Sequence, residues 1–250
     1  MGSPASVPAM TARQAGMELR LTTRRGENLL VTIVVPAAVL LFFGSTSLLP
    51  GSTGHPVDFL LPGALALAVI STSLVNLGIA TAYERSYGVL KLLGGSPLPR
   101  SGLIAAKIGA VLVIELVQVV LLLAVAVFAF GWSPGPGSSI LLGVVGLLLG
   151  TLAFAGLGLA MAGRLRAEAT LAAANGLFLV FLVLGGIVVP VDHLPGALVP
   201  LAGLLPASAL SELLRIAFGA SPDAVAGPLV ILALWGIGSA LVAVRTFRWE

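Results

Sequence analysis

The sequence predicts an all-α membrane protein with six transmembrane helices and with its N- and C-termini in the cytoplasm. Of its 250 residues, 58% are hydrophobic and only 9% are charged, whereas a soluble domain has about 45–50% apolar and about 25% charged residues. Six apolar stretches approach or exceed the roughly 20 residues that a helix needs to cross a bilayer. Twelve of the thirteen Lys and Arg residues fall on one side of these stretches, an asymmetry that indicates the cytoplasmic side.

The order of the apolar stretches gives the predicted domains. Residues 1–27 are expected to form a cytoplasmic arm and an interfacial helix, and residues 28–250 a six-helix transmembrane domain. The predicted spans are Leu29–Leu49, Phe59–Ala82, Gly102–Phe130, Ser139–Gly163, Ala169–Pro190 and Ala224–Val244. The basic residues assigned to the cytoplasm are Arg13, Arg20, Arg24, Arg25, Arg85, Lys91, Arg100, Lys107, Arg164, Arg166, Arg245 and Arg248, which leaves Arg215 outside.

Composition and missing motifs exclude several functions. The chain has no cysteine, which rules out disulfides and thiol chemistry. The net charge of +3 comes from few basic residues at the ends of apolar runs, which favours anchoring in the lipid bilayer over binding nucleic acid. A Gly-x-x-x-x-Gly-Lys phosphate loop is missing, so we expect no ATP hydrolysis and no bound cofactor in this chain.

The residues before the first span have a modest amphipathic pattern. Arg13, Arg20 and Arg24 form one basic stripe, with Met17 and Leu21 beside it. We predict an interfacial helix that leads into the first span. A solvated cytoplasmic arm is the alternative.

The predicted outer connection before the last span is unusual. Val191–Asp223 is 33 residues long and mostly apolar, and it is interrupted by several prolines. We predict one or two short helices that dip into the outer leaflet, where surrounding protein covers their backbone ends. The alternative is a surface amphipathic helix, Ala207–Phe218, that lies flat on the headgroups.

Few polar residues lie inside the predicted spans. Glu115 follows Lys107 by eight residues, about 12 Å deeper along a helix. A carboxylate there costs a few kcal/mol unless it faces a partner, a cavity or a proton. Gln118 shares its face. We predict that Glu115 and Gln118, together with Asn76, line a substrate path or a subunit contact; a protonated Glu115 with a packing role is the alternative.

Four outer residues have side chains that can bind metal: His55, Asp58, Asp192 and His193. Nothing in the sequence brings them together. A helix cap at Asp58 and solvated histidines are the favoured interpretation, and we predict no metal site.

The cytoplasmic link between the second and third spans reads 'TAYERSYGVLKLLGGSPLPRSGLIAAK'. Charged residues flank a short apolar patch in this link, and the patch ends at the stretch Gly94–Pro97. A short amphipathic helix held between two spans is suited to transmit force from a soluble partner. An ordinary positively charged loop is the alternative.

Three stretches carry a family resemblance over nearly the whole chain. They are 'RRGENLLVTIVVPAAVLLFFG', 'ERSYGVLKLLGGSPLPRSGLIAAK' and 'LLPASALSELLRIAFG'. In these stretches and their order the sequence resembles ABC-2 type transporter permeases, in particular the daunorubicin-exporter-like membrane subunits of bacteria. The resemblance implies an exporter of amphiphilic drug- or lipid-like substrates in the bacterial plasma membrane.

The same resemblance implies partners and site residues. Two permease subunits, identical or different, would form the pathway, and two separate ABC ATPase subunits carrying ATP and Mg would dock beneath them. The ATPase-coupling residues would be Arg24, Arg25, Glu84, Arg85, Gly88, Leu92, Pro97 and Arg100. The outer gate would include Leu205, Pro206, Glu212 and Arg215.

Three other functions stay open at the level of sequence. A proton-coupled secondary efflux carrier would place several ionisable groups and broken helices at midplane, often in matching halves, whereas the spans offer one central acid. A membrane enzyme would need a cluster of His, Asp or Glu on facing helices. An assembly or anchoring subunit would have no pathway of its own.

Overall fold

The structure is a computed structural model that describes residues 6–24, 26–45 and 56–246, with the side chains of residues 26–31 left undescribed. The described chain is built from helices. In chain order they are α1 (Val7–Arg24), α2 (Gly26–Gly44), α3 (Pro56–Val69), the π-helical η1 (Ile70–Asn76), α4 (Leu77–Ser86), α5 (Val89–Gly94), α6 (Arg100–Phe130), α7 (Ile140–Arg164), α8 (Ala167–Leu184), the 3₁₀-helical η2 (Val191–His193), α9 (Val199–Gly203), α10 (Pro206–Ala217) and α11 (Ala226–Thr246).

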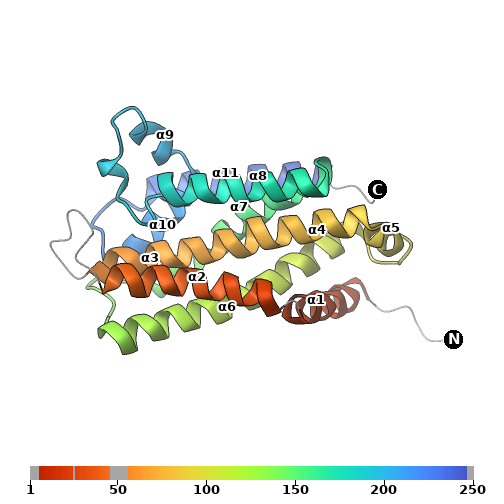
Figure 1. Ribbon diagram of the computed structural model, residues 1–250, viewed down its shortest axis with the longest axis horizontal. Helices are drawn as coiled ribbons and strands as arrows, with labels where there is room; N and C mark the ends of the chain where they lie inside the picture. The colour runs from red at the N-terminus through yellow and green to blue at the C-terminus, as the bar shows by residue number, and fades with distance from the viewer. Residues whose placement is uncertain (1–5, 25, 46–55, 247–250) are drawn as a thin grey trace.

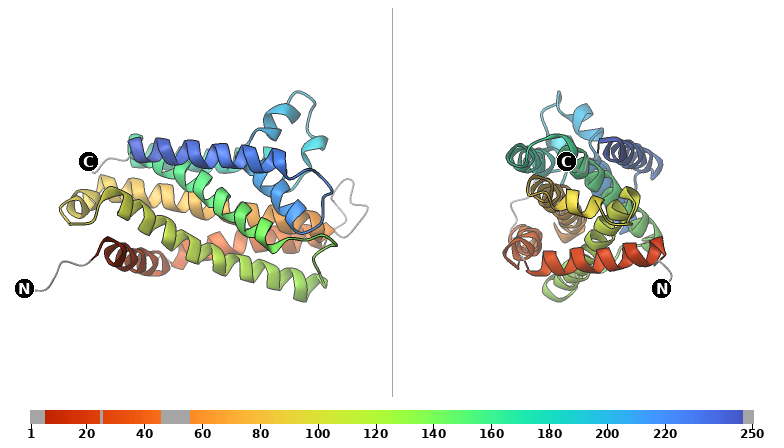
Figure 2. Two further views of the ribbon diagram at one scale, coloured as in Figure 1. Left: turned by 180° about the vertical axis from the view of Figure 1, so that it is seen from behind. Right: turned by 90° about the vertical axis from the view of Figure 1, so that its right-hand side faces the viewer.

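The long helices run along a common axis, and α1 lies across it (Figures 1 and 2). One end of the bundle carries α1, α5 and the last turn of α11, whereas α9 and α10 lie at the opposite end (Figure 1). The segments predicted to be cytoplasmic therefore share one end, which we call the basic end. That this end faces the cytoplasm remains a prediction from the charge distribution.

Five helices in the described chain are long and apolar enough to cross a membrane. The first is the continuous run of α3, η1 and α4, Pro56–Ser86, and the others are α6, α7, α8 and α11. The first predicted span, Leu29–Leu49, falls on α2. Helix α2 is 19 residues long, and its stretch Thr32–Gly44 is apolar; the side chains of residues 26–31 and all of residues 46–49 lie outside what the structure describes. A sixth span therefore remains a prediction.

The predicted span Ala169–Pro190 extends too far. Helix α8 ends at Leu184, and Gly186 beyond it has a φ of 64°. Glycine adopts this left-handed conformation at little cost. Two adjacent glycines, Gly185 and Gly186, end the helix inside a stretch that remains apolar, so composition alone did not reveal the break.

Helix α3 occupies the centre of the bundle, where nearly every side chain after Phe59 is buried. Its neighbours include α2, α6 and α10. A helix that is apolar on all sides is suited to such a position. The packing brings segments distant in sequence onto this helix.

Helices α7 and α11 are in close contact at Gly156. A Cβ atom at Gly156 would lie 2.3 Å from Ser239 Oγ and 2.8 Å from the backbone nitrogen of Ala240. Small residues allow this kind of close approach in membrane bundles. The contact therefore depends on the absence of a side chain at this glycine.

We predict that Gly156→Ala separates α7 from α11 and destabilises the protein by about 1–3 kcal/mol, the usual cost of overpacking. Thermal unfolding of the detergent-purified protein measures this effect. Gly176→Ala in α8 is the matched control, because nothing lies within 4 Å of a Cβ atom placed there. Equal melting temperatures for the two variants would contradict the proposed close packing.

Candidate functional site

A buried ion cluster joins three helices at the basic end. Lys107 of α6 is 1% exposed, and its Nζ lies 3.0 Å from Glu18 Oε2 of α1 and 2.6 Å from Glu84 Oε2 of α4. Gln14 Nε2 donates to Glu18 Oε1 at 2.8 Å, which orients this carboxylate. A buried ammonium is tolerated when it is paired and hydrogen-bonded. We call Glu18, Glu84 and Lys107 the Lys107 cluster.

Helix α5 follows α4, the helix that carries Glu84 of this cluster. Gly88, with a φ of 75°, forms the turn that separates α5 from α4. Leu90 is buried and fixes the helix to the bundle, whereas Leu92 is 80% exposed and Tyr87 before it is 76% exposed. Helix α5 therefore exposes an apolar surface outside the spans, while the buried Leu90 holds the helix against the bundle.

The predicted coupling residues do not share one environment. Glu84 turns inward to Lys107, and Arg85 donates from its Nη2 to the carbonyl of Leu165 after α7. Leu92 is exposed on α5, and Gly88 makes the turn described above. The exposed predicted residues at this end also include Arg24, Pro97 and Arg100. Arg25 lies outside the described residues.

A second polar cluster lies deeper, around Glu115 of α6. Ser73 Oγ of η1 lies 2.5 Å from Glu115 Oε1, and Thr151 Oγ1 of α7 lies 2.5 Å from Glu115 Oε2. All three side chains are buried. The carboxyl group of Glu115 therefore links α6 to both η1 and α7. Its two hydrogen bonds offset the cost of burying it.

Gln118, one turn further along α6, holds α2 and η1 together. Its Oε1 accepts from Thr72 Oγ1 at 3.0 Å, and its Nε2 donates to the carbonyl of Thr32 at 3.0 Å. That carbonyl lies four residues before Pro36, which has no N–H to donate to it. Gln118 thus supplies the hydrogen bond that the proline removes from α2. Asn76 Nδ2 donates to Thr32 Oγ1 at 2.7 Å.

The π-helical turn η1 supplies three members of this network: Thr72, Ser73 and Asn76. A π-helical stretch changes which side chains face the neighbouring helices, and such stretches are frequent at functional sites. Of the predicted substrate-path residues, Gln118 and Asn76 both bond to Thr32, whereas Glu115 bonds to Ser73, the neighbour of Thr72 in η1. A cavity of about 10 Å³ beside Gln118 is too small for a substrate.

A third polar cluster lies at the opposite end, around Arg215 of α10. Its Nη2 donates to the carbonyl of Gly186, its Nη1 lies 3.2 Å from Glu212 Oε2, and its guanidinium lies 4.0 Å from the ring centroid of Phe59. Burial lowers the pKa of Arg215, while Glu212 and Asp192 act to raise it. The Arg215 Nε and Glu212 Oε1 atoms are buried without a protein hydrogen-bond partner.

Further hydrogen bonds fix α10 in place. Ser211 Oγ donates to the carbonyl of Gly185 at 2.8 Å, and Ser208 Oγ donates to that of Ala202. Every residue of α10 except Glu212 and Ile216 is buried. This burial favours the predicted short helices covered by protein over a helix lying flat on headgroups. The predicted gate residues Leu205 and Pro206 form the start of α10.

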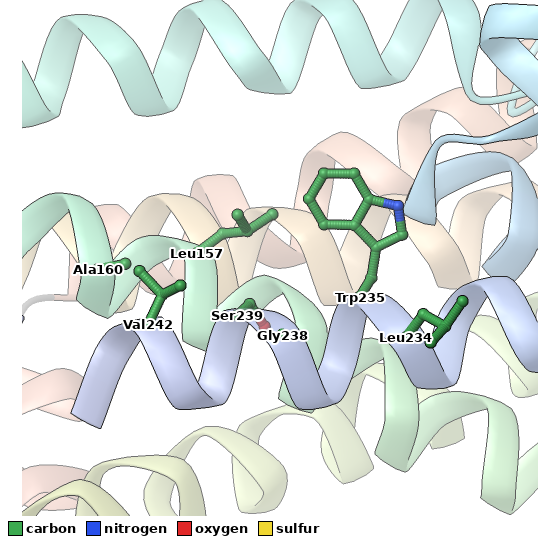
Figure 3. A pocket seen from close by; sticks show the side chains of 7 residues that line it. All are labelled: Leu157, Ala160, Leu234, Trp235, Gly238, Ser239 and Val242. Carbon is green, nitrogen blue, oxygen red and sulfur yellow. The ribbon is translucent and has the colours of Figure 1, made fainter. Parts of the chain in front are cut away.

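An apolar groove of about 350 Å³ lies between α7 and α11 (Figure 3). The lining residues are Leu157, Ala160, Leu234, Trp235, Gly238, Ser239 and Val242. Trp235 Nε1 donates to the carbonyl of Leu204 at 2.9 Å, and Ser239 Oγ donates to that of Gly236. With these donors already engaged, the groove offers mainly dispersion contacts to an apolar group.

The predicted outer residues Asp58 and Asp192 each contact a protein group. Trp132 Nε1 donates to Asp58 Oδ1 at 2.9 Å, and Asp192 lies beside His193. In the part of the chain that the structure describes, His, Asp and Glu form no group of three able to hold a metal ion. His55 lies outside that part.

Sequence reasoning missed the central role of Lys107, which it used only as a topological marker. The sequence did contain a signal: Lys107 lies seven residues into the apolar run that begins at Arg100, and a lysine at such a position needs a partner. It also overlooked Thr72, Ser73 and Thr151, because hydroxyl side chains are common in membrane helices. Neither the contacts of Lys107 nor those of the three hydroxyl residues follow a characteristic spacing in the sequence.

We predict that Glu115→Leu lowers the melting temperature, because it leaves the Ser73 and Thr151 hydroxyls without the carboxyl group, at a cost of about 1 kcal/mol. Glu115→Gln keeps the shape and can bond to both hydroxyls, so it should stay close to the parent protein. Thermal unfolding of the purified variants distinguishes them. Equal melting temperatures for the Leu and Gln variants would refute the bridging role.

Comparison with known proteins identifies the family. The family model for the ABC-2 type transporter matches residues 15–218. The match begins within α1, ends just after α10, and includes all three polar clusters. No curated protein matches the chain significantly. Because the model covers most of the sequence and its helices suit a multi-pass membrane protein, the chain belongs to the ABC-2 type transporter family.

Proposed function

We propose that the chain is the permease subunit of an ATP-binding-cassette exporter. It moves an amphiphilic drug- or lipid-like substrate across the cell membrane, using ATP hydrolysed by separate subunits. Two permease chains and two ATPase subunits form the working assembly. The family membership supports the transport role, and the exposed apolar tip of α5 is the observation that carries the coupling to a partner.

The tip of α5 has the properties of a docking element. Leu92 and Tyr87 expose large apolar surfaces at the basic end, beyond the spans that lipid would cover. Apolar surface exposed to water marks a contact with another protein. Leu90 and the Gly88 turn hold α5 firmly on α4, so that movement of the docked ATPase reaches the spans. Arg24, Pro97 and Arg100 flank this contact in our proposal.

An apolar groove and a set of buried polar side chains support the proposal of an amphiphilic substrate. The groove between α7 and α11 is apolar, and its polar atoms are engaged. Glu115, Gln118 and Asn76 are among the polar groups deep in the bundle. In our proposal, helix movement during the cycle opens this network and exposes these groups to the polar part of an amphiphile.

The outer segment is the gate in this proposal. Helix α10 packs on α3, α7 and α11, and Arg215 ties it to the glycines after α8. The unpartnered Arg215 Nε and Glu212 Oε1 atoms gain water contacts when the segment opens. Such a segment can open when the ATPase state that favours it is populated.

We predict that Leu92→Glu abolishes co-purification of the ATPase subunit with the tagged permease, because it places a charge in an apolar contact. Expression level and melting temperature should be unchanged, since Leu92 is exposed. Leu201→Glu is the control, because Leu201 is also exposed but lies on α9 at the opposite end. ATPase binding that survives Leu92→Glu would remove the case for α5 as the docking element.

We further predict that a disulfide between α7 and α10 closes the proposed gate. A Cβ atom at Gly143 would lie 3.8 Å from Ala217 Cβ, within the range for a disulfide, and the chain has no other cysteine. Oxidation of the Gly143→Cys/Ala217→Cys variant should stop export from vesicles, and reduction should restore it. Unchanged export in the fully oxidised protein would show that α10 need not leave α7.

A further inference from the structure

We infer that Lys107 is a positioning residue for ATP coupling: it clamps α1 to the end of α4, so that α1, α4 and the start of α6 move as one body. The inference rests on the proposed function, because it assumes that an ATPase docks at this end. Its physical basis is the Lys107 cluster, which the family match does not assign to any role.

The first argument is the geometry of the cluster. Glu18 precedes Lys107 by 89 residues and Glu84 precedes it by 23, yet both carboxylates contact the same ammonium. The Lys107 side chain is buried, and those of Glu18 and Glu84 are 11% and 13% exposed. Charge-assisted hydrogen bonds are about twice as strong as neutral ones. One side chain therefore fixes the relative positions of three helices.

The second argument is the way α1 lies on α6. Small residues of α6 face α1: a Cβ atom at Gly102 would lie 3.1 Å from Thr11 Oγ1, and one at Gly109 would lie 3.9 Å from Ala15 Cβ. Helix α1 runs across the bundle axis (Figures 1 and 2), so its apolar contacts alone resist sliding poorly. The Lys107 cluster lies between these two glycines and sets the register.

The third argument is the position of Glu84. It lies two residues before the end of α4 and four residues before Gly88, where α5 turns away. A displacement of α5 acts first on this part of α4. Through Lys107 the same displacement reaches α6 and α1 directly. Without the ammonium, Glu18 and Glu84 would repel each other and the two helices would separate.

Docking of α1 can be measured on the permease alone with a disulfide. Ala15→Cys and Gly109→Cys place two cysteines at a suitable Cβ separation in a chain that otherwise has none. Adding Lys107→Met should slow disulfide formation by roughly tenfold or more, the effect of losing a charged hydrogen bond. Arg13→Gln, at an exposed position on α1, is the control and should leave the rate unchanged.

The coupling role needs the complete transporter in vesicles. Lys107→Met should lower the export per ATP hydrolysed, measured per folded protein. Oxidation of the engineered disulfide between α1 and α6 should restore that ratio in the same variant. In the parent background this disulfide should leave the ratio unchanged. A purely structural role for Lys107 would reduce the amount of folded protein but not the ratio.

Each other outcome overturns a defined part of the proposal. Normal disulfide formation in the Lys107→Met variant refutes the clamp and leaves the proposed function standing. Slow formation with an unchanged ratio of export to ATP refutes the coupling role. A parent protein that stops exporting when linked shows that α1 must undock. If no ATPase subunit associates with the permease, the proposed function fails and the coupling role fails with it, whatever the docking rate.

Discussion

Lipid provides no hydrogen bonds, so a polar group buried in this bundle is stabilised chiefly by partners within the protein. This constraint explains where the described helices are tied together. Lys107 satisfies two carboxylates, Glu115 satisfies two hydroxyls, and Arg215 caps the free carbonyl of Gly186. Interhelical hydrogen bonds act together with van der Waals packing in membrane bundles. Each of the three polar clusters ties together helices that are distant in sequence.

The hydrogen bonds of Gln118 link two backbone irregularities, the proline in α2 and the π-helical turn η1. Pro36 removes a helical hydrogen bond from the carbonyl of Thr32, and Gln118 replaces it. The η1 turn brings Thr72 to the other side of the same amide. A proline in α2 and a π-helical turn in the neighbouring span thus become partners through one glutamine. Both irregularities are stabilised because the amide has two donors and an acceptor.

Much of the fold could be predicted from composition, because apolar length and charge asymmetry are properties of the sequence. Five predicted spans coincide with long apolar helices. The break after Leu184 was missed because Gly185 and Gly186 interrupt an apolar run without adding polarity. The polarity of Glu115 marked it as needing a partner, but the identity of that partner depends on which helices are neighbours. For the same reason Lys107 was predicted only as a cytoplasmic anchor.

One continuous helix connects the three clusters. The run of α3, η1 and α4 is 31 residues long: Glu84 near one end meets Lys107, Ser73 in the middle meets Glu115, and Phe59 near the other end lies under Arg215. A continuous helix transmits a displacement along its axis. A π-helical turn within it is a point at which the hydrogen-bonding pattern of the backbone can change. In the proposed cycle, movement of α5 therefore reaches the Arg215 contact through a single element, with η1 as the point where rotation changes the polar network. Under this proposal, the helix that carries the docking element α5 also contacts the proposed gate at Arg215, so the two ends can respond together without a separate relay.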